Sequence, residues 1–280
     1  MHQNKLTIPD IRNRKNGTAI SSITVYDYSW AKVADAAEID IALVGDSLGM
    51  VVLGYPDTVS VTMEDMVHHS KAVARGIERA LVVTDMPFGS CNNSIPEAIG
   101  NANRLLKEGR ADAVKIEGGI HMAPAVAAIV RAGIQVQGHI GLTPQTAAAL
   151  GGFKVQGKSA ESARQLIDDA RALEDAGCFS IVLEAIPAPL AAHITKAISI
   201  PTIGIGAGPG CDGQVLVIHD LIGLYDRFTP KFVKQYANIN EQVVAALTRY
   251  KAEVESRVFP DEAHSFTMKA EEMDKLARLY

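Results

Sequence analysis

The stretch IDIALVGDS, residues Ile39–Ser47, decides the fold. Apolar residues run without interruption from Ile41 to Val44 and stop at a glycine, and Asp46 and Ser47 follow at once. A short apolar run of this kind is typical of a strand that is buried on both faces of a parallel sheet. A carboxylate and a hydroxyl directly after such a strand indicate that the strand ends at a binding or catalytic site.

The same pattern recurs along the chain. An apolar run is followed by a polar or glycine-containing corner and then by an amphipathic helical segment. With residues 39–47, the runs that predict strands are residues 19–27, 80–87, 112–119, 134–142, 179–187, 200–208 and 214–220. Eight strands that alternate with helices are the number that closes a TIM barrel. The predicted fold class is therefore α/β, a (β/α)8 TIM barrel.

Helical patterns separate these strands. They are clearest in residues 29–39, 62–77, 94–109 and 159–177. Thr62 has Asp65 three residues on, which resembles a capping box, and Gly177 closes the longest pattern. The alternative architecture is an open doubly wound sheet, which places a glycine-rich phosphate fingerprint after its first strand. The segment TVYDYSWAK contains no glycine at that point, which favours the barrel.

Nothing in the sequence divides the chain into separate domains. No linker rich in serine or proline interrupts it, so we predict a single barrel domain over residues 1–280. It has an N-terminal extension of about residues 1–18 and extra C-terminal helices, a charged helical tail of about residues 230–280.

Composition restricts the partners. The net charge of -5 and the pI near 5.9 predict no nucleic-acid partner, because nucleic-acid binding needs a basic surface. No apolar run approaches the roughly 20 residues of a membrane span, so we expect no membrane association. The three cysteines lack metal-binding spacing, and the N-terminus has no signal-peptide core. These features predict a cytoplasmic protein with reduced thiols.

Polar residues gather at the predicted C-terminal ends of the strands, where TIM-barrel enzymes carry their catalytic groups. These residues are Tyr26, Asp27, Asp46, Ser47, Asp85, Lys115, Glu117, His139, Glu184, His219 and Asp220. Several carboxylates beside one lysine require a compensating positive charge. We therefore predict a divalent cation held by Asp46 and Asp85, since Mg²⁺ prefers hard oxygen ligands.

Each of these residues also has a purely structural interpretation. Asp46 fits a helix cap and Asp85 fits a turn. Lys115 and Glu117 fit solvated charges, and His139 fits a hydrogen-bonded core histidine. Glu184 is harder to explain structurally because apolar residues flank it, and carboxylates are rarely buried without a partner or a task. The shared position at strand ends, rather than any single residue, favours function.

Several motifs make the chain resemble the ketopantoate hydroxymethyltransferase family. In chain order they are VGDSLGM, TDMPFGS, VKIEGG, GHIGLTPQ, LEAIP, IGIGAG and DGQVLVIHDLIGL, and they cover about residues 20–224. The resemblance implies a hydroxymethyl transfer from 5,10-methylenetetrahydrofolate to 3-methyl-2-oxobutanoate (α-ketoisovalerate). The product is ketopantoate, formed through a Mg-stabilised enolate in the first step of pantothenate biosynthesis.

The resemblance also implies roles for individual residues. Asp46 and Asp85 match metal ligands, and Glu117 matches an acidic group near the metal. Ser47, Asp85 and Lys115 match ketoacid-binding positions, and Glu184 matches the proton acceptor. We add His139 as a further substrate-binding candidate. One Mg²⁺ per subunit, folate as co-substrate and a cytoplasmic homodecamer are likewise implications of the resemblance.

Two other functions compete with this hypothesis. One is a Mg-dependent lyase or aldolase of the phosphoenolpyruvate mutase-like barrels, which also forms an enolate but uses no folate. The other is a catalytically silent barrel that serves as a binding module. The full set of ionisable groups at the strand ends argues against a silent scaffold, because such groups reduce stability and are lost when unused.

Overall fold

The computed structural model describes residues 4–225 and 227–279. Eight parallel strands close into a barrel in chain order, which confirms the predicted fold class. They are β1 (Ile20–Thr24), β2 (Ile41–Val44), β3 (Leu81–Asp85), β4 (Ala113–Glu117), β5 (Val136–Gly141), β6 (Ser180–Glu184), β7 (Thr202–Ile205) and β8 (Gly213–Val217). The ring closes where β8 pairs with β1, with Gly213 opposite Ile20.

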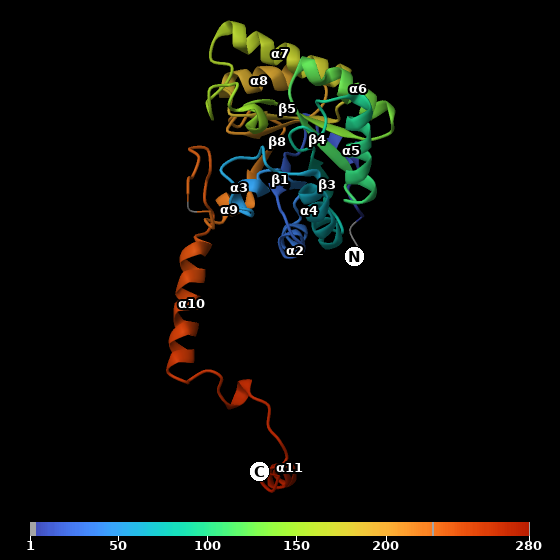
Figure 1. Ribbon diagram of the computed structural model, residues 1–280. Helices are drawn as coiled ribbons and strands as arrows, with labels where there is room; N and C mark the ends of the chain where they lie inside the picture. The colour runs from blue at the N-terminus through green and yellow to red at the C-terminus, as the bar shows by residue number, and fades with distance from the viewer. Residues whose placement is uncertain (1–3, 226, 280) are drawn as a thin grey trace.

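Helices cover most of the outside of the barrel (Figure 1). The helices along the chain are α1 (Ile8–Arg12), α2 (Tyr28–Ala36), α3 (Leu48–Val51), α4 (Met63–Gly76), α5 (Ile95–Lys107), α6 (Ala123–Arg131), α7 (Ala160–Asp175), α8 (Ala188–Ala197), α9 (Ile218–Leu221), α10 (Ile239–Glu255) and α11 (Ala270–Ala277). Short 3₁₀ turns are η1 (Ile120–Met122), η2 (Pro144–Thr146) and η3 (Glu262–His264). The predicted capping box of Thr62 and Asp65 starts α4, and Asp27 caps α2 with its carboxylate.

The barrel interior changes from apolar to polar along its axis. Ile11 of α1 is fully buried and packs with Ile20, Ile41 and other inward residues at the end where the strands begin. Because alternate strand residues point to the same face, the inward series of β4 continues from Ala113 to Lys115 and Glu117. The apolar end therefore closes the barrel, and the polar groups are collected at the opposite end.

The last repeats are irregular. Residues 206–212, all of which the structure describes, connect β7 to β8 without a helix. The prediction that the last strand continues to Asp220 was wrong, because β8 ends at Val217, opposite the last residue of β1, Thr24. His219 and Asp220 lie instead in the four-residue helix α9.

The C-terminal tail extends away from the barrel. Figure 1 shows α10 and α11 in orange and red beyond the barrel wall, and every described residue of the two helices is at least partly exposed. One side of α10 carries four exposed apolar residues with spacings of four, three and four: Val243, Leu247, Tyr250 and Val254. Among the described residues, no helix is long and apolar enough to cross a membrane.

Candidate active site

The predicted site residues converge at the C-terminal end of the barrel. The final residues of β3, β4 and β6 are Asp85, Glu117 and Glu184, and β5 contributes His139. Asp46 and Ser47 follow β2 directly, as the sequence predicted. Of these residues, only Ser47 and Glu184 are more than slightly exposed. The closed parallel register thus places residues that are far apart in the chain around one small space.

Lys115 occupies the centre of this cluster. Its Nζ atom lies 3.0 Å from Asp85 Oδ1 and 4.0 Å from Glu117 Oε1. Burial lowers the pKa of Lys115, but the Asp85 and Glu117 carboxylates outweigh burial and raise this pKa above its usual range. The side chain is therefore a fixed positive charge inside the barrel mouth.

His139 links this lysine to Glu184. Its Nδ1 atom lies 3.1 Å from Lys115 Nζ and 3.4 Å from Glu117 Oε1, and its Nε2 atom lies 3.1 Å from Glu184 Oε2. The Nε2 contact is an ion pair rather than a well-aligned hydrogen bond. Burial and Lys115 lower the pKa of His139, but its close contacts with the Glu117 and Glu184 carboxylates prevail and raise this pKa to about 9.

The lysine contact and this raised pKa favour different charge states of the ring. Lys115 has no acceptor, so its 3.1 Å approach to His139 Nδ1 is a hydrogen bond only when the ring is neutral. The carboxylates prevail over the lysine, because a charged ring faces Glu117 on one side and Glu184 on the other. The imidazole of the cation-free protein is therefore protonated at neutral pH.

Asp46 and Asp85 form the pair of oxygen donors that the sequence predicted. The backbone N–H of Asp46 donates to Asp85 Oδ2 at 3.0 Å, which brings the two residues together. Burial, followed by repulsion from Asp85 and Glu117, raises the pKa of Asp46 well above its usual range. Burial also raises the pKa of Asp85, although Lys115 opposes this shift.

This pair fits a hard divalent cation. Asp85 Oδ1 is buried and has no well-aligned hydrogen bond with any described residue, although Lys115 is close to it. Carboxylate oxygens with unsatisfied charge in a buried site are the donors that Mg²⁺ prefers. Among the described residues, no three His, Cys, Asp or Glu side chains form a ready-made ligand cage. The role of Glu117 near a cation therefore stays a prediction.

Sequence reasoning did not assign a role to Tyr26. Its hydroxyl lies 2.8 Å from Ser47 Oγ and 2.9 Å from Thr24 Oγ1, so it joins β1 to the predicted substrate-binding serine. Tyr26 is 1% exposed, and burial raises its pKa. Its position directly after a strand was the available signal, but its partner lies 21 residues away along the chain.

Gln145 is the second residue that the sequence did not single out. It lies in η2, and it contacts both Asp46 and Glu117 through hydrogen bonds. Its place in the GLTPQ segment gave a loop position but no indication of these contacts, because they cross 99 and 28 residues of chain. Only the closed barrel brings them together.

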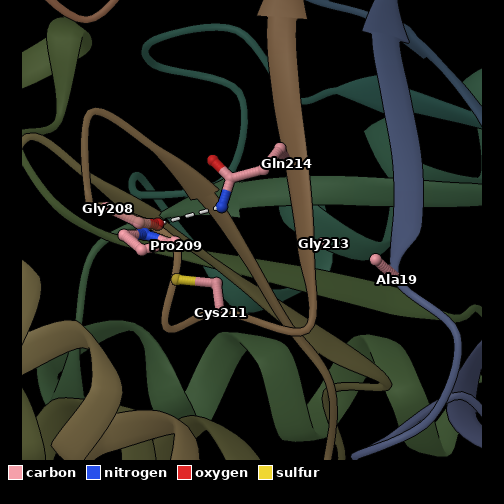
Figure 2. A pocket seen from close by; sticks show the side chains of 6 residues that line it. All are labelled: Ala19, Gly208, Pro209, Cys211, Gly213 and Gln214. Carbon is pink, nitrogen blue, oxygen red and sulfur yellow. Dashed lines mark hydrogen bonds between the residues drawn. The ribbon is translucent and has the colours of Figure 1, made fainter.

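The carboxylate cluster is distinct from an open cavity on the barrel wall (Figure 2). This cavity of about 390 Å³ lies beside the β7–β8 connection and is lined by Ala19, Gly208, Pro209, Cys211, Gly213 and Gln214. Gln214 Nε2 donates to the carbonyl of Gly208 at 3.0 Å across it. None of these residues carries a charged side chain, so the strand-end cluster is the better candidate for catalysis.

Comparisons with known proteins show which family this chain resembles. The family described as ketopantoate hydroxymethyltransferase matches residues 5–262. The 3-methyl-2-oxobutanoate hydroxymethyltransferase of Heliobacterium modesticaldum is 61% identical over 265 residues, which are 94% of this chain and 96% of that protein. The enzyme of the same name from Syntrophobacter fumaroxidans is 58% identical over 277 residues, 99% of this chain and 98% of the relative.

Solved structures support the fold alone. A phosphonopyruvate hydrolase in complex with oxalate and Mg²⁺ has a TM-score of 0.59 and 13% identity, with 98% of each chain covered. A 2,3-dimethylmalate lyase of the PEP mutase/isocitrate lyase superfamily has a TM-score of 0.57 and 17% identity, with 98% of this chain and 100% of that chain covered.

Proposed function

Because the chain belongs to the ketopantoate hydroxymethyltransferase family, we propose that its barrel mouth converts 3-methyl-2-oxobutanoate to ketopantoate. The one-carbon donor is 5,10-methylenetetrahydrofolate, and the reaction opens pantothenate biosynthesis. The observation that carries this function is the cluster at the strand ends in which the half-buried Glu184 lies beside the buried Asp46, Asp85 and Lys115. It supplies oxygen donors, a fixed positive charge and a carboxylate base in one space.

We assign Asp46 and Asp85 as the residues that hold one Mg²⁺ per subunit. Their donor set and their raised pKa values support this role, because a bound cation offsets the burial, and the repulsion between carboxylates, that raise these pKa values. When bound there, the cation supplies Lewis-acid polarisation of a ketone oxygen. Glu117 lies at the edge of the pair and contributes further negative charge.

Ser47 and Lys115 bind the ketoacid. The Ser47 hydroxyl is held by Tyr26, so it is oriented before the substrate arrives. Lys115 provides the fixed charge that attracts the substrate carboxylate, and Asp85 orients its ammonium group. His139 contacts both Lys115 and Glu184, and thus keeps the substrate-binding and proton-accepting groups in one connected network.

Glu184 accepts the proton from the carbon next to the ketone. It closes β6 at the barrel mouth, and its side chain is 14% exposed, which leaves it open to substrate but largely removed from water. The carbanion that results forms a bond to the methylene carbon of the folate, and both carbon–nitrogen bonds of that methylene group break. Water supplies the hydroxyl oxygen, and tetrahydrofolate leaves with one proton from the substrate carbon and one from water. His139 Nε2 lies 3.1 Å from Glu184 Oε2 and orients this carboxylate for the step.

The competing function is that of an enolate-forming lyase, because 2,3-dimethylmalate lyase has a similar barrel. That similarity rests on 17% identity, whereas the hydroxymethyltransferases reach 61%. The purified chain should form ketopantoate from 3-methyl-2-oxobutanoate only when Mg²⁺ and methylenetetrahydrofolate are both present. Folate-independent cleavage of a 2-hydroxy or 2,3-disubstituted acid, without ketopantoate formation, contradicts the proposal.

We further propose that the chain is a single barrel domain that assembles into a homo-oligomer, a decamer by resemblance to its family, through the tail. The β8–β1 wall has a groove of about 530 Å³ whose lining includes Ile23, Leu216, Leu221 and Tyr236. Backbone hydrogen bonds from Tyr236 to Leu221 and from Ile239 to Ile222 attach the chain beside this groove, and α10 then extends away from the barrel (Figure 1). The apolar side of α10 therefore suits a second copy of the chain better than its own barrel.

A cytoplasmic location fits the chemistry of the cysteines. Cys91, Cys178 and Cys211 are all free in the structure. Free thiols are stable in a reducing compartment, where the substrates of a biosynthetic enzyme are also available.

A further inference from the structure

Gln145 connects two of the acidic residues at the barrel mouth. Its side-chain Nε2 donates to Asp46 Oδ2 at 2.8 Å and to the carbonyl of Met86 at 3.0 Å. Its backbone N–H donates to Glu117 Oε2 at 3.0 Å. Gln145 itself is 9% exposed. Gln145, in the loop after β5, thus binds Asp46 after β2, Met86 after β3 and Glu117 at the end of β4.

The bonding leaves little freedom to the carboxamide. One acceptor of Nε2 is the carbonyl of Met86, which cannot donate, so this partner determines the orientation of the amide. The two N–H groups of Nε2 are matched by two acceptors, which fixes the plane of the group. A hydrogen bond to an ionised carboxylate is stronger than one between neutral groups, and burial strengthens it further.

The same bonds determine how the carboxylate of Asp46 is presented. Oδ2 of Asp46 is occupied by the hydrogen bond from Gln145. Glu117 is held in a similar way, with Oε2 on the backbone of Gln145 and Oε1 facing His139. Neutral donors between the two carboxylates orient them without cancelling the negative charge that attracts a cation.

We propose that Gln145 is the positioning residue of the cation site, which fixes the carboxylate of Asp46, and with it Glu117, in the orientation that binds the divalent ion. This inference rests on the proposed cation site. The proposed role of Gln145 is to orient Asp46, and it does not involve contact with the substrate or the reacting atoms. Removal of its carboxamide therefore weakens cation binding even without substrate.

The test uses the full-length protein after removal of metal with a chelator. Mg²⁺ affinity is measured by calorimetry and Mn²⁺ affinity by electron paramagnetic resonance, and thermal unfolding is recorded without metal. Gln145→Met keeps the chain length and the backbone N–H but removes both side-chain donors. We expect its affinity for both ions to fall by about 10-fold to 100-fold, as for other residues that orient metal ligands.

Gln137→Met is the matched control. Gln137 is also a buried glutamine of this barrel, with 2% exposure, but its Nε2 donates to Ser180 Oγ and not to the acidic cluster. We expect it to lower the unfolding temperature while leaving both cation affinities unchanged. If Gln145→Met does not fold, Gln145→Asn, whose amide is one methylene too short to reach Asp46, is judged by the same criteria.

Three outcomes separate the hypotheses. Cation affinity that is unchanged in the Gln145 variant overturns the positioning role while the cation site stands. An equal loss of affinity in both glutamine variants also overturns it, because the effect is then general destabilisation. A wild-type protein that binds neither Mg²⁺ nor Mn²⁺ overturns the cation site itself.

Discussion

The Nζ atom of Lys115 lies 3.0 Å from Oδ1 of Asp85, and the two side chains are only 5% and 4% exposed. Removal of one member of a buried ion pair leaves the other charge without compensation. Lys115 therefore stabilises the barrel mouth and prepares it for an anionic substrate, and these two roles can be measured separately.

Lys115→Met should destabilise the metal-free protein by about 3–5 kcal/mol, because Asp85 and Glu117 lose their buried counter-charge. Lys115→Met combined with Asp85→Asn should cost less than the sum of the single changes. Urea unfolding with a chelator measures both effects. Lys32→Met, which breaks an exposed pair with Glu78, is the control and should leave the stability almost unchanged. Additive losses contradict the coupling.

The same Lys115→Met variant should raise the KM for the ketoacid by about 10-fold to 100-fold, which corresponds to a charge-assisted hydrogen bond of about 1.5–3 kcal/mol. Steady-state kinetics with the folate saturating gives this value. A normal KM means that the lysine does not contact the substrate carboxylate.

Asp85→Ala should abolish turnover and weaken Mg²⁺ binding, because a donor oxygen of the proposed cation site disappears. Calorimetry on the metal-free protein measures the affinity. Asp65→Ala removes a carboxylate from the cap of α4 instead, so it should cost about 1 kcal/mol of stability without any change in cation affinity. Equal Mg²⁺ affinity in wild type and Asp85→Ala rules out the ligand role.

Glu184→Gln should bind 3-methyl-2-oxobutanoate but stop exchange of its C3 hydrogen with deuterated water. The amide keeps the size of the side chain, but it cannot accept the proton. Proton NMR of the substrate follows the exchange without folate, so the proton-transfer step is seen alone. Exchange at the wild-type rate shows that another group is the base.

Stability of the metal-free protein should fall as the pH rises from about 6.5 to about 9. The pKa of His139 is raised to about 9 in the folded state against 6.5 unfolded, so its contribution is complete below pH 6.5 and is lost above pH 9. The change is on the order of 2–3 kcal/mol. Urea unfolding across this range, compared with His139→Gln, isolates it; equal slopes for the two proteins argue against a protonated His139.

Leu247→Asp should reduce the size of the assembly in analytical ultracentrifugation. Leu247 is 61% exposed on the apolar side of α10, where a second copy is proposed to pack. Arg249→Asp places the same acid about 200° around the helix from Leu247 and should leave the assembly intact. A wild-type protein that sediments at 29.9 kDa contradicts the assembly itself.

The strands and most of the site residues could be predicted from the local sequence. The apolar runs predicted all eight strands, because a strand buried on both faces needs continuous apolar residues whatever its neighbours are. The motifs at the strand ends predicted the residues that the structure brings together, since the C-terminal ends of parallel strands meet at one rim. The extent of the last strand could not be predicted in the same way, because it depends on where the neighbouring strand stops.

By itself, the sequence determined the barrel, the family and the set of ionisable groups at its mouth, because periodicity and motif order are properties of the chain. Only the tertiary structure decided which of these groups touch. Tyr26 reaches Ser47, and Gln145 reaches Asp46 and Glu117, across gaps of 21, 99 and 28 residues. No local pattern encodes such contacts, since they arise from the angular position of each strand once the ring has closed.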